Sequence, residues 1–229
     1  HLDGIPRSKF TPPGPRRMGF DAYWAGYNCH HEYFKPKYYL DTPELIETSG
    51  YEPDIQTGLA IEFLKQNAGG PFFLMVSYGP PHDPYDQVPD SYKSLYDPEK
   101  LILRPNAPNA NRKQMSGYYA HITALDANVG RLVRTLEELG IRENTLVIYT
   151  SDHGDMLGSH DRKNKQQPWE ESIRVPLILS QPGRFAAGTK PDALFGTADL
   201  APTLLALAGA PVPREMEGQD LSGTLRGGS

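Results

Sequence analysis

Residues 149–155 read Tyr-Thr-Ser-Asp-His-Gly-Asp and close an apolar run that begins at Thr145. The run predicts a strand over 145–149. The Asp-His-Gly corner that follows would bring the carboxylate of Asp152 and the imidazole of His153 to the rim of a sheet, where ligands bind in open α/β folds. The pair therefore predicts a metal site, although the same three residue types can also form a simple turn.

Helical periodicity appears in three other stretches of the chain. A helix is expected to begin at Pro53 and to end at the Gly-Gly pair 69–70, and a longer one is expected over 113–139, with Gly140 as its stop. A shorter helix is expected over 200–208, with Asp199 as its N-cap. The apolar face of the long helix would contain Ile122, Leu125, Val129, Leu132, Leu136 and Leu139.

Two further apolar runs, 72–78 and 175–179, predict buried strands that alternate with these helices. This alternation predicts an α/β fold with a mainly parallel sheet sandwiched between helices. At 229 residues the chain can bury a sizeable core as one domain.

Composition excludes several classes of partner. The net charge is −5 and the lysines and arginines are scattered, so no basic face for nucleic acid is expected. The apolar runs fall well short of the ~20 residues of a membrane span, so no membrane partner is expected either. The single cysteine, Cys29, excludes an internal disulfide framework and is expected to be a buried small side chain.

Two more blocks accompany the Asp-His-Gly corner. Residues 81–85 read Pro-His-Asp-Pro-Tyr, and residues 165–176 read Lys-Gln-Gln-Pro-Trp-Glu-Glu-Ser-Ile-Arg-Val-Pro. Taken alone, His82 would be an ordinary loop histidine and Lys165 a solvated surface charge.

The three blocks together resemble the sulfatase family of the alkaline-phosphatase-like superfamily. In that family a sequence close to Ser-Asp-His-Gly-Glu-Met-Leu-Gly precedes Lys-x-x-x-Tyr/Trp-Glu-Glu-Ser-x-Arg-Val-Pro, and a Pro-His-x-Pro-Tyr motif precedes both. His1 and Leu2 resemble the end of the family's Gly-Lys-Trp-His-Leu-Gly segment. The resemblance covers nearly the whole chain and implies an alkaline-phosphatase-like fold.

One part of the family pattern is missing from the chain. The family's nucleophile is a formylglycine made from the Cys or Ser of a Cys/Ser-x-Pro-x-Arg motif. Cys29 is followed by His-His-Glu-Tyr and lacks the required proline and arginine. The resemblance therefore implies a partial catalytic domain over 1–229, with the formylglycine upstream of this chain and a C-terminal subdomain also outside it.

The resemblance implies hydrolysis of sulfate esters with the help of a divalent metal. Such a reaction places charge on the sulfate oxygens and on the departing alkoxide, so it needs cations and a proton donor. Asp152 and His153 would bind the metal, Lys165 would neutralise the sulfate, His82 would protonate the leaving oxygen, and His1 would orient the nucleophile. We expect these groups to converge on one pocket, within roughly 10 Å of one another.

The metal, the substrate and the activity itself each leave alternatives open. Calcium is the usual sulfatase metal but prefers oxygen ligands, whereas the nitrogen of His153 suits manganese or zinc better. A sulfated carbohydrate is the favoured substrate, and the resemblance implies a periplasmic, extracellular or lysosomal location. A phosphonate monoester or phosphodiester hydrolase of the same superfamily is the alternative enzyme, and a catalytically inactive fragment is a third reading.

The remaining histidines are expected to have structural roles. They are His30, His31, His121 and His160. The aromatic cluster over 24–39, which contains the first two, predicts either core packing or a wall on which a sugar stacks.

Overall fold

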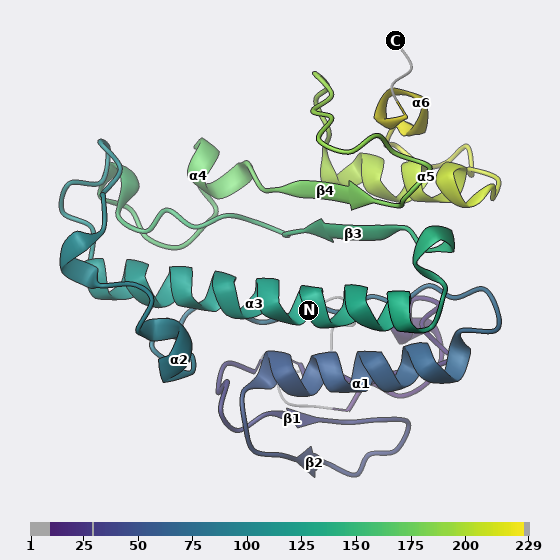
Figure 1. The fold of residues 1–229 in the computed structure, drawn as a ribbon, viewed down its shortest axis with the longest axis horizontal. Coiled ribbons are helices and arrows are strands. Elements are labelled where there is room, and N and C mark those ends of the chain that lie inside the picture. Colours follow the sequence, from purple (N-terminus) through teal and green to yellow (C-terminus); the bar gives the residue numbers. More distant parts are fainter. Residues whose placement is uncertain (1–9, 29, 227–229) are drawn as a thin grey trace. The chain divides into compact units, whose positions relative to one another are not determined.

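The structure is a computed structural model that describes residues 10–28 and 30–226. It divides into two compact units. The first unit runs to Leu139 and also takes in Leu157–Lys163, and the second contains Gly140–Met156 and the chain from Asn164 onward (Figure 1). The single domain expected over 1–229 stays a prediction.

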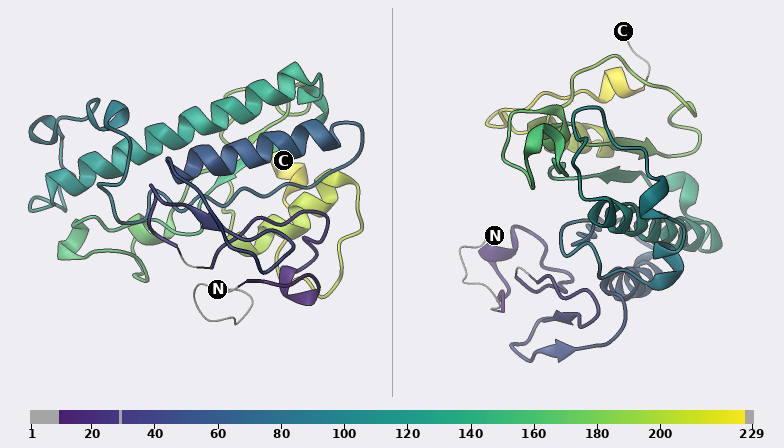
Figure 2. Two further views of the ribbon diagram at one scale, coloured as in Figure 1. Left: turned by 90° about the horizontal axis from the view of Figure 1, so that it is seen from below. Right: turned by 90° about the vertical axis from the view of Figure 1, so that its left-hand side faces the viewer.

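Two long helices form the scaffold of the first unit. Helix α1 spans Glu52–Asn67 and helix α3 spans Arg112–Glu138, and the two pack side by side (Figure 2). The side chain of Asn111 caps α3 by accepting a hydrogen bond from the Gln114 amide at 3.1 Å. Gly140 follows with φ of 70°, a left-handed conformation that glycine adopts without strain. Both helices are confirmed where the sequence predicts them.

Small side chains dominate the buried face of α3. Leu125 and Leu136 are buried as their spacing predicts, but Ile122 is 39% exposed. Ala120 and Ala124 are fully buried instead. The buried face of α3 is therefore rotated relative to the predicted apolar stripe. Alanine side chains are small, so neighbouring segments pack more closely on the alanine face than they could on leucines.

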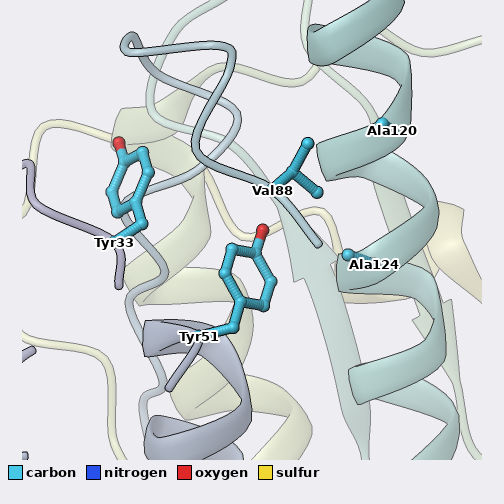
Figure 3. Packing of buried hydrophobic residues seen from close by; sticks show 5 residues of the cluster. All are labelled: Tyr33, Tyr51, Val88, Ala120 and Ala124. Atoms are coloured by element: carbon cyan, nitrogen blue, oxygen red, sulfur yellow. The ribbon is translucent and has the colours of Figure 1, made fainter. Parts of the chain in front are cut away.

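The main core of the first unit is an aromatic and alanine cluster. It consists of Tyr33, Tyr51, Val88, Ala120 and Ala124. Figure 3 shows Val88 between the two tyrosines and the alanines of α3. Val88 belongs to the connection 79–111, so this long segment is an ordered part of the core.

Shorter elements complete the first unit. Strands β1 (Lys37–Tyr38) and β2 (Ile46–Glu47) pair antiparallel. Helix α2 (Asp90–Lys93) and a 3₁₀ turn at Pro98–Lys100 both pack on α3. Two more 3₁₀ turns lie at Pro15–Arg17 and Ser159–Asp161.

A buried histidine lies beneath the loop that carries His82. His121 has no exposed surface, and its Nδ1 lies 2.7 Å from the hydroxyl of Tyr51. Its Nε2 lies 3.4 Å from the carbonyl of Pro84, which can only accept, so Nε2 carries the proton and Nδ1 accepts from Tyr51. Burial lowers the pKa of His121 to about 4.

This depressed pKa predicts a loss of stability in mild acid. Below about pH 6.5 the unfolded chain protonates His121 while the folded protein does not, so stability is present above that pH and is lost as the pH falls toward 4. The free energy of unfolding should fall by about 2 kcal/mol between pH 7.5 and 5 from this group. Urea unfolding of the wild type and of His121→Asn measures the effect, and an equal pH slope in both proteins would refute it.

The second unit is built around a short antiparallel pair. Strand β3 (Val147–Thr150) pairs with β4 (Leu177–Ser180), with Thr150 opposite Leu177. A 3₁₀ turn at Arg142–Asn144 precedes β3. The helices of this unit are α4 (Glu170–Ile173), α5 (Thr197–Ala208) and α6 (Ser222–Leu225).

The start of α5 corrects one prediction. Gly196, not Asp199, is the N-cap, and α5 begins before the predicted residue 200. Asp199 lies in the first turn, where its carboxylate accepts hydrogen bonds from the amides of Gly196 and Gln219, both at 2.8 Å. A carboxylate three residues inside the helix can serve the exposed amides at its start as well as an N-cap side chain does.

The predicted parallel sheet is wrong for the strands that the structure describes. Residues 10–28 and 30–226 contain two two-stranded sheets, and both are antiparallel. Residues 72–78 are not assigned to a strand, and their side chains alternate between half-buried and exposed, with Phe73 at 67% and Met75 at 63% exposure. An apolar run reveals an extended segment, but neither its partner nor the direction of pairing.

No helix in the described part of the chain is both long and apolar enough to cross a membrane.

Candidate active site

The Asp-His-Gly corner directly follows β3, as the sequence predicts. The carboxylate of Asp152 is 87% exposed, and its Oδ2 lies 3.7 Å from Nε2 of His153. The corner is held by short local bonds. The His153 amide donates to Asp152 Oδ1 at 3.0 Å, and the Ser151 hydroxyl donates to the His153 carbonyl at 2.8 Å. These bonds place the two side chains together at the end of the strand.

The ring of His153 is oriented for binding through Nε2. Its Nδ1 lies 2.7 Å from the carbonyl of Gly154, and a carbonyl can only accept, so Nδ1 carries the proton. The neutral ring then has its lone pair on Nε2, the nitrogen nearest Asp152. A metal-bound histidine usually donates its other N–H to such a carbonyl. The pair thus fits two ligand positions of one divalent cation.

Gly154 connects this corner to α4. Its amide donates to the carbonyl of Ser172 at 2.8 Å, and a Cβ built on it would lie 2.1 Å from the carbonyl oxygen of Glu171. Only glycine allows this approach. The contact requires glycine at position 154 and joins the corner to the backbone of α4.

Lys165 lies on a loop of the same unit. The loop is fixed at one end by the Met156 amide, which donates to the Asn164 carbonyl at 2.8 Å, and at the other by the Gln167 amide, which lies 3.4 Å from the Ser172 hydroxyl. The neighbours of Lys165, Asn164 and Gln166, have φ of 62° and 68°. Non-glycine residues adopt this left-handed conformation uncommonly, and such residues cluster at functional sites.

Asp152 and His153 alone do not complete a metal site. Across the residues that the structure describes, no group of three or more His, Cys, Asp or Glu side chains could hold a metal ion. Calcium takes six to eight oxygen ligands, and zinc usually takes four ligands. Tight binding therefore requires ligands beyond this pair.

Removal of Asp152 should weaken metal binding. In the full-length polypeptide, Asp152→Ala is expected to lower the affinity for Ca²⁺ or Mn²⁺ by at least about tenfold. Loss of a residue that only orients a metal ligand typically costs about that much affinity, and loss of the ligand itself should cost no less. Asp126→Ala, an exposed carboxylate on α3, is the matched control. Calorimetry on metal-stripped protein measures both, and equal affinities would remove Asp152 from the metal site. Residues 1–229 alone should bind either ion only weakly.

His82 lies in the first unit, on the loop that follows the extended segment. Its Nδ1 is 2.9 Å from both the carboxylate Oδ1 and the carbonyl of Asp83. Because both partners accept, Nδ1 is the donor. A second proton on the ring would therefore be carried by Nε2.

The loop that carries His82 is anchored to the core. The Tyr33 hydroxyl donates to the His82 carbonyl at 2.9 Å, and burial raises the pKa of Tyr33 well above its ordinary value, so the hydroxyl stays protonated. Further along, Gly117 of α3 passes so close that a Cβ on it would lie 2.1 Å from the Tyr85 carbonyl oxygen. The backbone is thus held at His82 and again at Tyr85.

One neighbour of His82 has no signal in the sequence. The imidazole of His31 stacks on that of His82, with ring centroids 4.6 Å apart and planes inclined by 14°. The expectation of a purely structural role overlooks this contact, since the two residues are far apart along the chain. The adjacent His30 differs, because its Nδ1 lies 3.4 Å from Glu52 Oε2 and its side chain is only 10% exposed.

The other predicted residues fall into three groups. Asp152 and His153 lie together, with Lys165 in the same unit. His82 lies in the other unit, so its convergence with them stays a prediction. His1 and Cys29 lie outside the described residues.

The sulfatase family model matches residues 1–210 of the chain. The chain belongs to the sulfatase family. This sulfatase chain is 41% identical over 232 residues to an ulvan-active sulfatase of Formosa agariphila, and the match covers 97% of the chain and 45% of that relative. It is 31% identical over 227 residues to an endo-4-O-sulfatase of Bacteroides thetaiotaomicron, covering 92% of the chain and 44% of the relative.

A solved structure gives the same assignment. The putative sulfatase yidJ of Bacteroides fragilis superposes with a TM-score of 0.89 at 35% identity, over 96% of this sulfatase chain and 51% of that structure. The fold is therefore sulfatase-like. The chain spans about half the length of the curated relatives it matches, at 45% and 44%.

Proposed function

We propose that the protein hydrolyses sulfate esters of a carbohydrate with the help of a divalent metal. The observation that carries the proposal is the Asp152–His153 pair. Oδ2 of Asp152 and Nε2 of His153, the atoms that would bind the metal, lie 3.7 Å apart, and the bond from Nδ1 to the Gly154 carbonyl orients the ring. Membership of the sulfatase family supports the sulfuric ester as the class of substrate. The nucleophile, a formylglycine by family resemblance, lies upstream of this chain in the proposal.

Asp152 and His153 would hold the metal, which supplies a Lewis acid for the sulfate oxygens. Calcium is favoured by the family, whereas the His153 nitrogen favours manganese or zinc. Lys165 would place its ammonium against the non-bridging oxygens and toward the leaving oxygen, where negative charge grows as the ester bond breaks. His1 would orient the nucleophile by a hydrogen bond.

His82 would supply the proton for the leaving group. As the oxygen of the nucleophile forms its bond to sulfur, the bond between sulfur and the sugar oxygen breaks, and the sugar oxygen takes the electron pair of that bond and the proton from Nε2 of His82. The ring is left neutral, with its remaining proton on Nδ1 toward Asp83, which is 2.9 Å away. Water can return the lost proton before the next turnover.

Two observations support a carbohydrate as the leaving group. The named relatives include an ulvan-active sulfatase and an endo-4-O-sulfatase. In this chain the segment 24–39 contains partly exposed rings, among them Tyr27 and Tyr39, whose planes are parallel to within 1° at 5.8 Å. Such rings suit stacking against the apolar face of a sugar.

The test is a comparison of kcat/KM in the full-length polypeptide. Sulfated oligosaccharides and aryl sulfates are compared with a phosphonate monoester and a phosphate diester. The proposal predicts that sulfate esters are hydrolysed faster. A clear preference for the phosphorus esters would favour the phosphonate or phosphodiester hydrolase, and no turnover of any ester would favour the inactive reading. Residues 1–229 alone should be inactive on all of them.

A further inference from the structure

The stacked pair His31–His82 is the contact that the proposed chemistry does not use. The two ring planes are nearly parallel, inclined by 14°, and their centroids lie 4.6 Å apart. His82 is 29% exposed on its side chain and His31 is exposed at the surface. Because the His31 ring is exposed, its stack on His82 adds little buried apolar surface to the core, and burial alone does not account for the contact.

Tyr33 connects both histidines to the core. Its hydroxyl lies 2.9 Å from the His82 carbonyl and 3.5 Å from Nδ1 of His31. The ring of Tyr33 is fully buried and packs edge-on against His121 at 5.5 Å. One rigid side chain therefore fixes the backbone of His82 and lies beside the ring that covers it.

We propose that His31 is a positioning residue that holds the imidazole plane of His82 for proton transfer to the leaving oxygen. The proposal rests on the proposed function, since it assigns the partner of the same proton donor. His31 does not exchange a proton in this account. It acts through His82 by contact between ring faces.

The physical need for such a contact follows from the rotamer of His82. The outer torsion of a histidine side chain is broad, and the contacts of Nδ1 with Asp83 fix one atom of the ring rather than its plane. A tilt moves Nε2, the atom that would face the leaving oxygen. Proton transfer requires Nε2 within hydrogen-bond distance of that oxygen, and misplacement by about 1 Å can cost ~10²-fold in rate. A flat group lying on one ring face restricts the tilt.

The test uses the full-length polypeptide with three variants. His31→Ala removes the stack, His31→Phe keeps a flat ring without nitrogens, and Glu32→Ala is the control at the neighbouring exposed position. We expect His31→Ala to lower kcat/KM for a sugar sulfate by about tenfold, a fraction of what loss of the acid itself would cost. Nitrophenyl sulfate, which needs little protonation, should be nearly unaffected. His31→Phe should recover most of the loss, and Glu32→Ala should behave as wild type.

A double variant shows whether His31 acts through His82. In a His82→Ala background, adding His31→Ala should cause no further loss on the sugar sulfate, because the group being positioned is gone. A further tenfold loss would overturn the proposal. Equal losses on both substrates, or a His31→Phe protein as slow as His31→Ala, would overturn it as well.

Failure of the proposed function has a different signature. If the wild-type protein hydrolyses none of the esters, the sulfatase proposal fails, and the stack is then judged by NMR of the His82 ring protons. Those resonances should move in His31→Ala, because a neighbouring ring current is lost, and should stay in Glu32→Ala. Unmoved resonances would show that the rings do not stack in solution and would overturn the inference.

Discussion

Replacement of His82 by alanine is expected to slow hydrolysis of a sugar sulfate by at least ~10²-fold, the range in which general acids contribute. The sugar alkoxide is a poor leaving group and needs a proton as the ester bond breaks. A nitrophenolate leaves without one, so nitrophenyl sulfate should lose much less. The ratio of the two losses, measured as kcat/KM in the full-length polypeptide, reports protonation of the leaving group rather than general damage.

A histidine elsewhere provides the control for this substitution. His160 is held by Asn106, whose carbonyl accepts from the His160 amide at 2.9 Å and whose Nδ2 lies 3.2 Å from the ring. His160 has a φ of 53°, a conformation that asparagine tolerates, so His160→Asn should fold and keep near wild-type rates on both substrates. Equal losses on the two substrates in His82→Ala would take the general-acid role from His82.

Replacement of Lys165 by alanine is expected to cost at least ~10²-fold on both substrates. Its ammonium acts mainly on charge at the non-bridging oxygens of the sulfate group, which both substrates share. Most of the loss should fall on kcat, because the charge that Lys165 meets is larger in the transition state than in the ground state. Parallel losses for Lys165→Ala and divergent losses for His82→Ala would separate the two roles.

Lys163→Ala is the matched control for Lys165. Lys163 is exposed and lies on the same loop, so it tests whether any nearby cation suffices. We expect it to change the rate by less than about twofold at moderate salt, because exposed charges are well screened. A Lys163→Ala protein as slow as Lys165→Ala would show that the loop, rather than the Lys165 ammonium, is required.

The helices show what the sequence could predict about the fold. The lengths of α1 and α3 follow from spacing and from end signals such as Pro53 and Gly140, which act locally. The buried face of α3 could not be placed as well, because alanines at 120 and 124 carry little signal in an apolar pattern yet allow close packing. The burial of Val88 could not be predicted either, since residues far away in the chain bury it.

The strands show where local pattern fails. The runs 145–149 and 175–179 lie within one or two residues of β3 and β4, but the two strands pair antiparallel. Hydrophobicity reports that a strand is buried and says nothing of the direction of its neighbour. The run 72–78 is not assigned to a strand in the described chain, and its side chains alternate between half-buried and exposed.

In the candidate site, too, local features could be predicted and contacts between distant residues could not. The Asp152–His153 pair could be predicted because the turn after β3 is local, and the close approach of Gly154 to the backbone of Glu171 agrees with glycine at that position. The stack of His31 on His82 could not, because it depends on how Tyr33 packs under a distant loop. Contacts between residues remote in sequence leave no periodic trace.

The central claim is that Asp152, His153, Lys165 and His82 serve one sulfate ester. A crystal structure of the full-length protein with a divalent metal and a slowly hydrolysed sugar sulfate tests it most directly. We predict that Asp152 and His153 bind the metal, and that the Lys165 ammonium and the His82 ring lie within roughly 10 Å of it and face the sulfate ester. A His82 ring turned away from the sulfate and beyond that distance would contradict the claim.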